Sequence, residues 1–108
     1  GKKRKSTSPI YKDRKTLSKD GILVVTVIIG KVDGLLIKDP EITTRGMTEQ
    51  DEMDFFCGDL KIALIDKLKQ YLPASSDSIK SMIEENTNKL LFRKTRRTPV
   101  ILPIILEF

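Results

Sequence analysis

The chain has 108 residues, of which 39% are hydrophobic and 32% charged, and this composition is typical of one small globular domain. It contains no histidine and one cysteine, which removes the commonest general base and the usual zinc ligands and excludes an internal disulfide. No apolar run approaches the roughly 20 residues that span a bilayer, and no signal peptide is recognisable, so we expect a cytoplasmic protein with no membrane partner.

Positive charge is concentrated at the start of the chain. Residues 1–20 hold eight Lys and Arg against two Asp, a net charge of +6, whereas residues 21–108 hold twelve Lys and Arg against thirteen Asp and Glu, a net charge of −1. We predict a basic linker or tail over residues 1–15 and a folded domain over residues 16–108. The tail either attracts RNA phosphates without reading sequence or is a solvated linker with incidental charge. Its candidate RNA-binding residues are Lys2, Lys3, Arg4 and Lys5.

Two strands are expected next. Residues 22–29 form a continuous apolar run, which predicts a strand buried on both faces. The Asp33–Gly34 step that follows is a hairpin signal. The second strand is then expected over about residues 35–45, where Pro40 places it at a sheet edge or marks a bulge.

The first helix is expected from Thr48 to the residue before Pro73, because apolar side chains recur there at three- and four-residue steps. Gly58 lies inside this helix and indicates either a close approach to the sheet or a later helix start. Cys57 has no histidine that could activate it, so we predict that it fills a helix face rather than reacts.

The second helix is expected over about residues 77–94, ending before Pro99. Asn86 falls next to its apolar stripe, and we place the amide at the stripe's margin because a buried amide needs partners. A basic cluster closes the helix, and it either complements the helix dipole or binds RNA phosphates. The candidate RNA-binding residues there are Arg93, Lys94, Arg96 and Arg97.

Seven of the last ten residues are large and apolar, so residues 99–108 should form a docked strand rather than a frayed end. Both faces of this strand are mostly apolar, and Pro103 suits an edge position. Following the chain direction through two antiparallel helices, the strand comes out parallel to residues 22–29, and we expect it to pair there. The alternative is antiparallel pairing with the second strand.

The element order is strand, strand, helix, helix, strand. We predict an α+β fold, a small two-layer sandwich in which a three-stranded mixed sheet packs on a two-helix hairpin (ββααβ). One sheet face then has no cover from this chain, which is typical of an association surface, whereas one helix on each face would leave no such patch. We predict that the interface contains Val25, Val27, Ile101, Pro103 and Ile105.

Three segments resemble the C-terminal domain of ribonuclease J, a bacterial enzyme family of the metallo-β-lactamase/β-CASP superfamily. Residues 13–21 are similar to its D-R-x-x-L-S-x-[DE]-G segment, and residues 39–46 to its G-P-D-[IL]-[IS]-S-R-G-F segment. Residues 91–108 are similar to the family's end, which closes in L-P-[IV]-I-M-E-V. Departures include Met47 where the family favours Phe and Thr98 where Arg is usual.

The resemblance implies a fragment of a zinc-dependent ribonuclease that degrades and processes RNA, with zinc and catalysis in other domains of the parent enzyme. It implies no catalytic and no metal-binding residue in this chain, whose role would be self-association or docking to the catalytic core. An RNA-binding module using the tail and the Arg93–Arg97 cluster is the second hypothesis. A free-standing small enzyme is disfavoured, because no nucleophile here has a base and an orienting group at plausible spacing.

Overall fold

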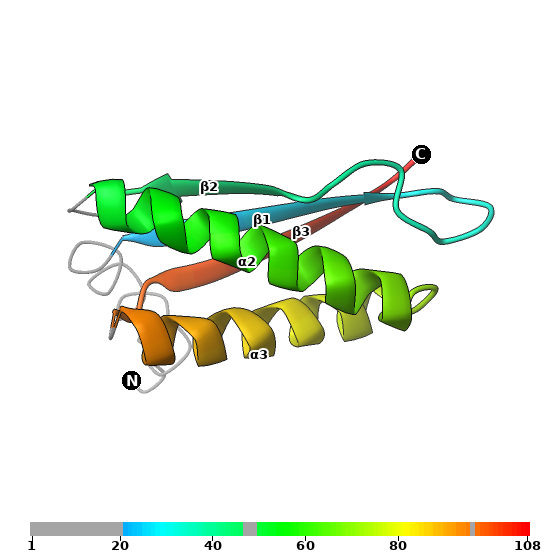
Figure 1. The fold of residues 1–108 in the computed structure, drawn as a ribbon. Helices are drawn as coiled ribbons and strands as arrows, with labels where there is room; N and C mark the ends of the chain where they lie inside the picture. The colour runs from blue at the N-terminus through cyan, green and yellow to red at the C-terminus, as the bar shows by residue number, and fades with distance from the viewer. Residues whose placement is uncertain (1–20, 47–49, 96) are drawn as a thin grey trace, which may run out of the picture.

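The computed structural model describes residues 21–46, 50–95 and 97–108 (Figure 1). The predicted tail, its boundary at residue 16 and the expected helix start at Thr48 lie outside these residues. Five elements follow in the predicted order: β1 (Ile22–Ile29), β2 (Glu41–Arg45), α2 (Gln50–Tyr71), α3 (Ser76–Lys94) and β3 (Val100–Glu107).

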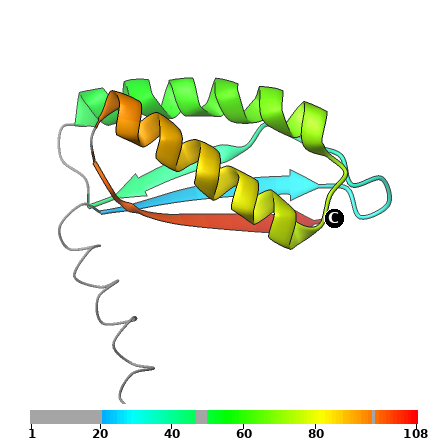
Figure 2. The same cartoon turned by 90° about the horizontal axis from the view of Figure 1, so that it is seen from below.

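The strands form one mixed sheet in the order β2-β1-β3, as predicted. β1 is central, antiparallel to β2 and parallel to β3, so the alternative pairing of β3 with β2 is excluded. Both helices lie on the same side of the sheet (Figures 1 and 2), which also excludes one helix on each face. The predicted two-layer α+β architecture is therefore confirmed.

Pro103 lies on an edge strand, as predicted, because β3 is the last strand of the sheet. The Val100 N–H donates to the Gly21 carbonyl at 3.1 Å, and the Phe108 N–H donates to the Ile29 carbonyl at 3.0 Å. Even-numbered residues of β3 thus turn their N–H groups toward β1, and odd-numbered ones turn outward. Pro103 falls at an outward position, where the absence of an N–H costs no ladder hydrogen bond.

The second strand is shorter than predicted, since it begins only after Pro40. Upstream of that proline only Leu36 forms an isolated bridge, with Ile29. The β1–β2 connection is a tight turn in which the Gly30 N–H donates to the Leu35 carbonyl at 2.9 Å and Asp33 Oδ1 accepts the Leu35 N–H at 3.0 Å. Proline thus marks the start of the edge strand rather than its middle.

The core lies between the helices and one face of the sheet. The odd-numbered residues of β1 are buried against the apolar stripes of α2 and α3 and against Ile101 of β3. Fully or almost fully buried positions are Leu23, Val25, Val27, Ile29, Met53, Phe56, Leu60, Leu64, Leu68, Ile79, Ile83 and Leu91.

The polar residues of α3 have different environments at its start and along its buried face. Ser75 caps α3, because its Oγ accepts the Ser78 N–H at 3.1 Å, so the helix begins one residue before the predicted start. Asn86 is half-buried at the margin of the stripe, as expected, and its Nδ2 donates to the Met82 carbonyl at 2.8 Å. Thr87, rather than Asn86, is the polar residue in the core, and its Oγ1 has no hydrogen-bond partner among the described residues.

Gly58 marks neither a close approach to the sheet nor a later start of the helix, the two roles expected for it. Helix α2 runs through it without interruption, and a Cβ at this exposed position would meet no atom within 4 Å. Gly34 is the opposite case: its φ of 72° lies in the left-handed region, and a Cβ would lie 2.8 Å from the Cβ of Pro73. The two glycines therefore make a matched pair.

We expect Gly58→Ala to raise the free energy of unfolding by about 1 kcal/mol, because alanine loses less backbone entropy in a helix interior. Gly34→Ala should lower it by about 1–3 kcal/mol, because it combines backbone strain with a clash at the end of α2. Urea denaturation followed by circular dichroism measures both. Equal effects of the two substitutions would contradict these local environments.

Candidate functional site

The sheet face that points away from the helices is apolar across two neighbouring strands. Side chains alternate along a strand, so the even-numbered residues of β1 and β3 share this face. The register pairs Val24 with Leu102 and Ile28 with Leu106, which places them side by side. We call this surface the open face, and define it by Ile22, Val24, Thr26, Ile28, Val100, Leu102, Ile104 and Leu106.

The open face is exposed in the described part of the chain. Leu102, Ile104 and Leu106 keep 41%, 40% and 39% of their surface accessible, and the β1 residues beside them are half-buried. Figure 2 shows the two helices on the opposite side. A contiguous aliphatic surface of two strands is typical of a protein–protein contact.

The margin of the open face is polar. β2 turns Glu41, Thr43 and Arg45 toward it, all exposed. Lys38 Nζ lies 2.8 Å from Glu41 Oε2, and this hydrogen bond, with the charge of the lysine, lowers the pKa of the Glu41 carboxyl. An apolar centre with charged residues along one side is the usual arrangement of a contact surface.

The sequence placed this surface on the wrong side of the sheet. Val25 and Val27 are completely buried and Ile101 is 9% exposed, all three in the core under the helices. Pro103 and Ile105 are half-buried on that same side. Both faces of β1 and β3 are apolar in sequence, so alternation alone could not tell which face the helices cover, and a shift of one residue exchanges the two sets.

Three residues of the predicted basic cluster, Arg93, Lys94 and Arg97, lie in the described part of the chain. Lys94 Nζ pairs with Asp59 Oδ2 of α2 at 3.2 Å, and the half-buried Arg97 donates its backbone N–H to Thr95 Oγ1 at 3.0 Å. Arg96, together with the tail residues 2–5, lies outside the described residues. Arg93 instead points into a groove beside α2.

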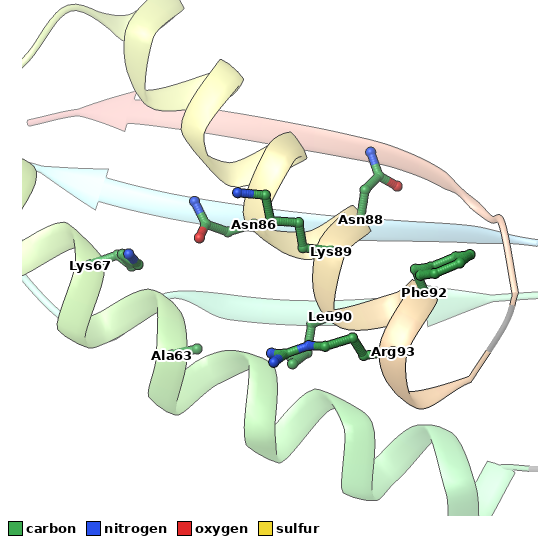
Figure 3. Close-up of a pocket in the computed structure, with 8 residues that line it drawn as sticks. All are labelled: Ala63, Lys67, Asn86, Asn88, Lys89, Leu90, Phe92 and Arg93. Carbon is green, nitrogen blue, oxygen red and sulfur yellow. The ribbon is translucent and has the colours of Figure 1, made fainter.

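This groove brings together cations that the sequence analysis missed. Figure 3 shows Arg93 reaching from α3 toward α2 and Lys67 extending from α2 toward Asn86. Lys67 and Lys89 stand far apart in sequence, and they line the same groove because the two helices form a hairpin. Spacing along one helix carries no signal for such a pair. The groove has a volume of about 710 Å³ and is lined by Ala63, Lys67, Asn86, Asn88, Lys89, Leu90, Phe92 and Arg93.

Two classes of chemistry find no site in the described residues. No group of three His, Cys, Asp or Glu residues is placed there to hold a metal ion, so this part of the chain does not fit a zinc centre.

Burial, and then the charge of Asp54, raises the pKa of the Cys57 thiol. Among residues 21–46, 50–95 and 97–108, no helix is long and apolar enough to cross a bilayer.

Comparison with known proteins decides the family. The model of the ribonuclease J C-terminal domain matches residues 10–108. The chain belongs to the ribonuclease J C-terminal domain family. Ribonuclease J2 of Bacillus subtilis is 31% identical over 101 residues, and ribonuclease J 2 of Streptococcus pyogenes is 27% identical over 101 residues. In both cases the match covers 91% of this chain but only 18% of the relative, so the chain spans about a fifth of those ribonucleases.

We expect the Cys57 thiol to react slowly with Ellman's reagent in the folded chain and quickly in urea, because only the thiolate is nucleophilic. The pKa of the Cys57 thiol in the folded chain lies above its ordinary value of 9.0. As the pH rises through 9.0, the thiol of the unfolded chain therefore loses its proton before the thiol of the folded chain does. The folded state then loses stability relative to the unfolded state. Denaturation of Cys57→Ser should show a smaller loss over the same pH range; identical losses would contradict the raised pKa.

Proposed function

We propose that this ribonuclease J C-terminal domain is a non-catalytic assembly module. Its open face packs against another part of the enzyme, either a second copy of the domain or the catalytic region. The observation that carries the proposal is the aliphatic surface across β1 and β3, with Leu102, Ile104 and Leu106 each about two-fifths exposed. RNA cleavage, and the zinc that supports it, is assigned to the part of the parent enzyme outside this chain.

The energetics of the open face support this role. Full burial of a leucine or isoleucine is worth about 1.5–3 kcal/mol, so covering the exposed two-fifths of each of the three β3 residues is worth roughly 1 kcal/mol per residue. The half-buried residues of β1 add to this sum. Such a surface supports association of moderate strength and is costly to leave in water.

The proposal extends to the setting of the enzyme. The matched relatives are named as ribonucleases, which supports a role of the parent enzyme in RNA degradation and processing, and we place that role in the cytoplasm. The partners proposed are thus the parent enzyme itself and, through it, RNA.

A second candidate function is RNA binding by the domain itself. It is supported by the net charge of +6 in residues 1–20 and by the position of Arg93 at the groove between the helices. Electrostatic binding of this kind positions RNA without reading its sequence. The two roles use different surfaces and are compatible.

We expect the chain to self-associate in analytical ultracentrifugation, and Ile104→Glu to raise the dissociation constant at least about tenfold, because an unpaired carboxylate in an apolar contact is costly. Ile62→Glu is the matched control: Ile62 is 70% exposed on α2, far from the open face, and its substitution should change nothing.

If the wild-type chain stays monomeric at high concentration, the same two variants are compared for binding to the catalytic region supplied as a separate polypeptide. A loss confined to Ile104→Glu supports docking. Failure of the wild-type chain both to self-associate and to bind that region would overturn the assembly role.

For the RNA role, we expect binding of a short fluorescent oligoadenylate to weaken steeply between about 50 and about 200 mM salt. Replacing Lys2, Lys3, Arg4 and Lys5 by glutamine should reduce the slope of log affinity against log salt by up to about 3, at about 0.7 per phosphate contact. No measurable affinity at low salt would overturn this function.

A further inference from the structure

We propose that the groove between α2 and α3 is an RNA-binding site that holds the phosphodiester backbone of a single strand, with Phe92 as a stacking platform beside it. The groove lies on the helix layer, and the open face lies on the other side of the sheet (Figures 2 and 3). The choice of RNA as the ligand rests on the second proposed function, but the site itself is independent of the assembly role.

The charge of the groove carries the proposal. Three of its lining residues are cations, from two different helices, and none is acidic. Lys67 comes from α2, whereas Lys89 and Arg93 come from successive turns of α3. Neighbouring cations repel one another, so their gathering around one hollow favours an anionic occupant with repeated charges.

The acids nearby leave these cations available. Lys89 Nζ lies 3.5 Å from Glu85 Oε2, but both side chains are about two-thirds exposed, so the attraction is weak. Asp66, next to Lys67 in sequence, accepts a hydrogen bond from Gln70 at 3.2 Å, and Asp59 pairs with Lys94 near the end of α3. These two carboxylates of α2 thus have partners other than the cations of the groove.

Aliphatic and amide side chains line the groove together with the cations. Ala63 of α2 and Leu90 of α3 are both among its lining residues (Figure 3). Asn86 uses Nδ2 for the Met82 carbonyl, so this amide is held against its own helix at the groove. The groove therefore offers apolar surface as well as positive charge to an occupant.

The aromatic residue separates RNA from an acidic peptide as the occupant. Phe92 is 73% exposed, and Figure 3 shows it with Asn88 on the side of α3 away from α2. Phe92 still lines the same groove as the three cations. An exposed ring at the rim of a positively charged groove is an arrangement that binds single-stranded nucleic acid, because bases stack on the ring while phosphates meet the charges. A phenylalanine offers no such gain to a run of carboxylates.

The test is a salt titration of oligoadenylate binding by fluorescence anisotropy, with the 108-residue chain and four variants: a groove variant, a control variant, Phe92→Ala and the chain with the glutamine-substituted tail. In the groove variant Lys67, Lys89 and Arg93 are replaced by glutamine. In the control variant Lys61, Lys69 and Lys80 are replaced by glutamine; these are exposed lysines of the same helices that lie outside the groove, so the net charge of the two variants is equal.

We expect the groove variant to lower the slope of log affinity against log salt by about 2, at about 0.7 per lost phosphate contact, and the control variant to change it far less. Phe92→Ala should weaken binding about fivefold or more at every salt concentration without changing the slope. Circular dichroism establishes that all variants remain folded.

Equal losses in the groove and control variants would overturn the site, because binding would then follow net charge alone. Binding abolished by the glutamine-substituted tail and untouched by the groove variant would also overturn it, while leaving the RNA-binding function intact. Polyglutamate competing as well as oligoadenylate would overturn the assignment of RNA. No RNA binding by the wild-type chain would overturn both the site and the function.

Discussion

The parallel pairing of β3 with β1 completes the sheet on which the two helices pack. Among the described residues β1 is the one strand with neighbours on both sides, and β3 supplies eight paired positions, against five from β2. That pairing also places Ile101 beside Leu23 in the core under the helices. Without β3, the central strand would lose one of its two hydrogen-bonded neighbours, and α3 would lose the strand on which it packs. The core and the open face are two sides of the same pair of strands.

Most of the fold could be predicted from the sequence, because the apolar periodicity and the positions of the prolines are clear and agree with one another. The helical stripe from Met53 to Leu68 has a clear period, Pro73 and Pro99 bound the helices, and Pro103 marks an edge. The mixed sheet followed from chain direction. The second strand was overextended, because apolar residues before Pro40 resemble a strand although they belong to the turn.

The open face could be predicted only in part from the sequence. Its existence followed from counting layers, but its residues did not, because strands that are apolar on both faces carry no mark of which face is covered. The groove was missed for a different reason: Arg93 was noticed as part of a local cluster, whereas its partners Lys67 and Lys89 become neighbours only through the helix hairpin. A run of charges in the sequence shows only local neighbours, so residues that the helix hairpin brings to the same groove are not found from it.

The late position of β3 has a consequence for biosynthesis. β1 emerges from the ribosome early and can meet β2 across a short turn, but its second partner follows only after both helices have been made. Contacts so distant in sequence form slowly. Until β3 has paired with β1, both apolar faces of β1 are exposed to aggregation with other chains. The helix hairpin is built from local contacts and is suited to cover one face of β1 early, while the other face stays exposed.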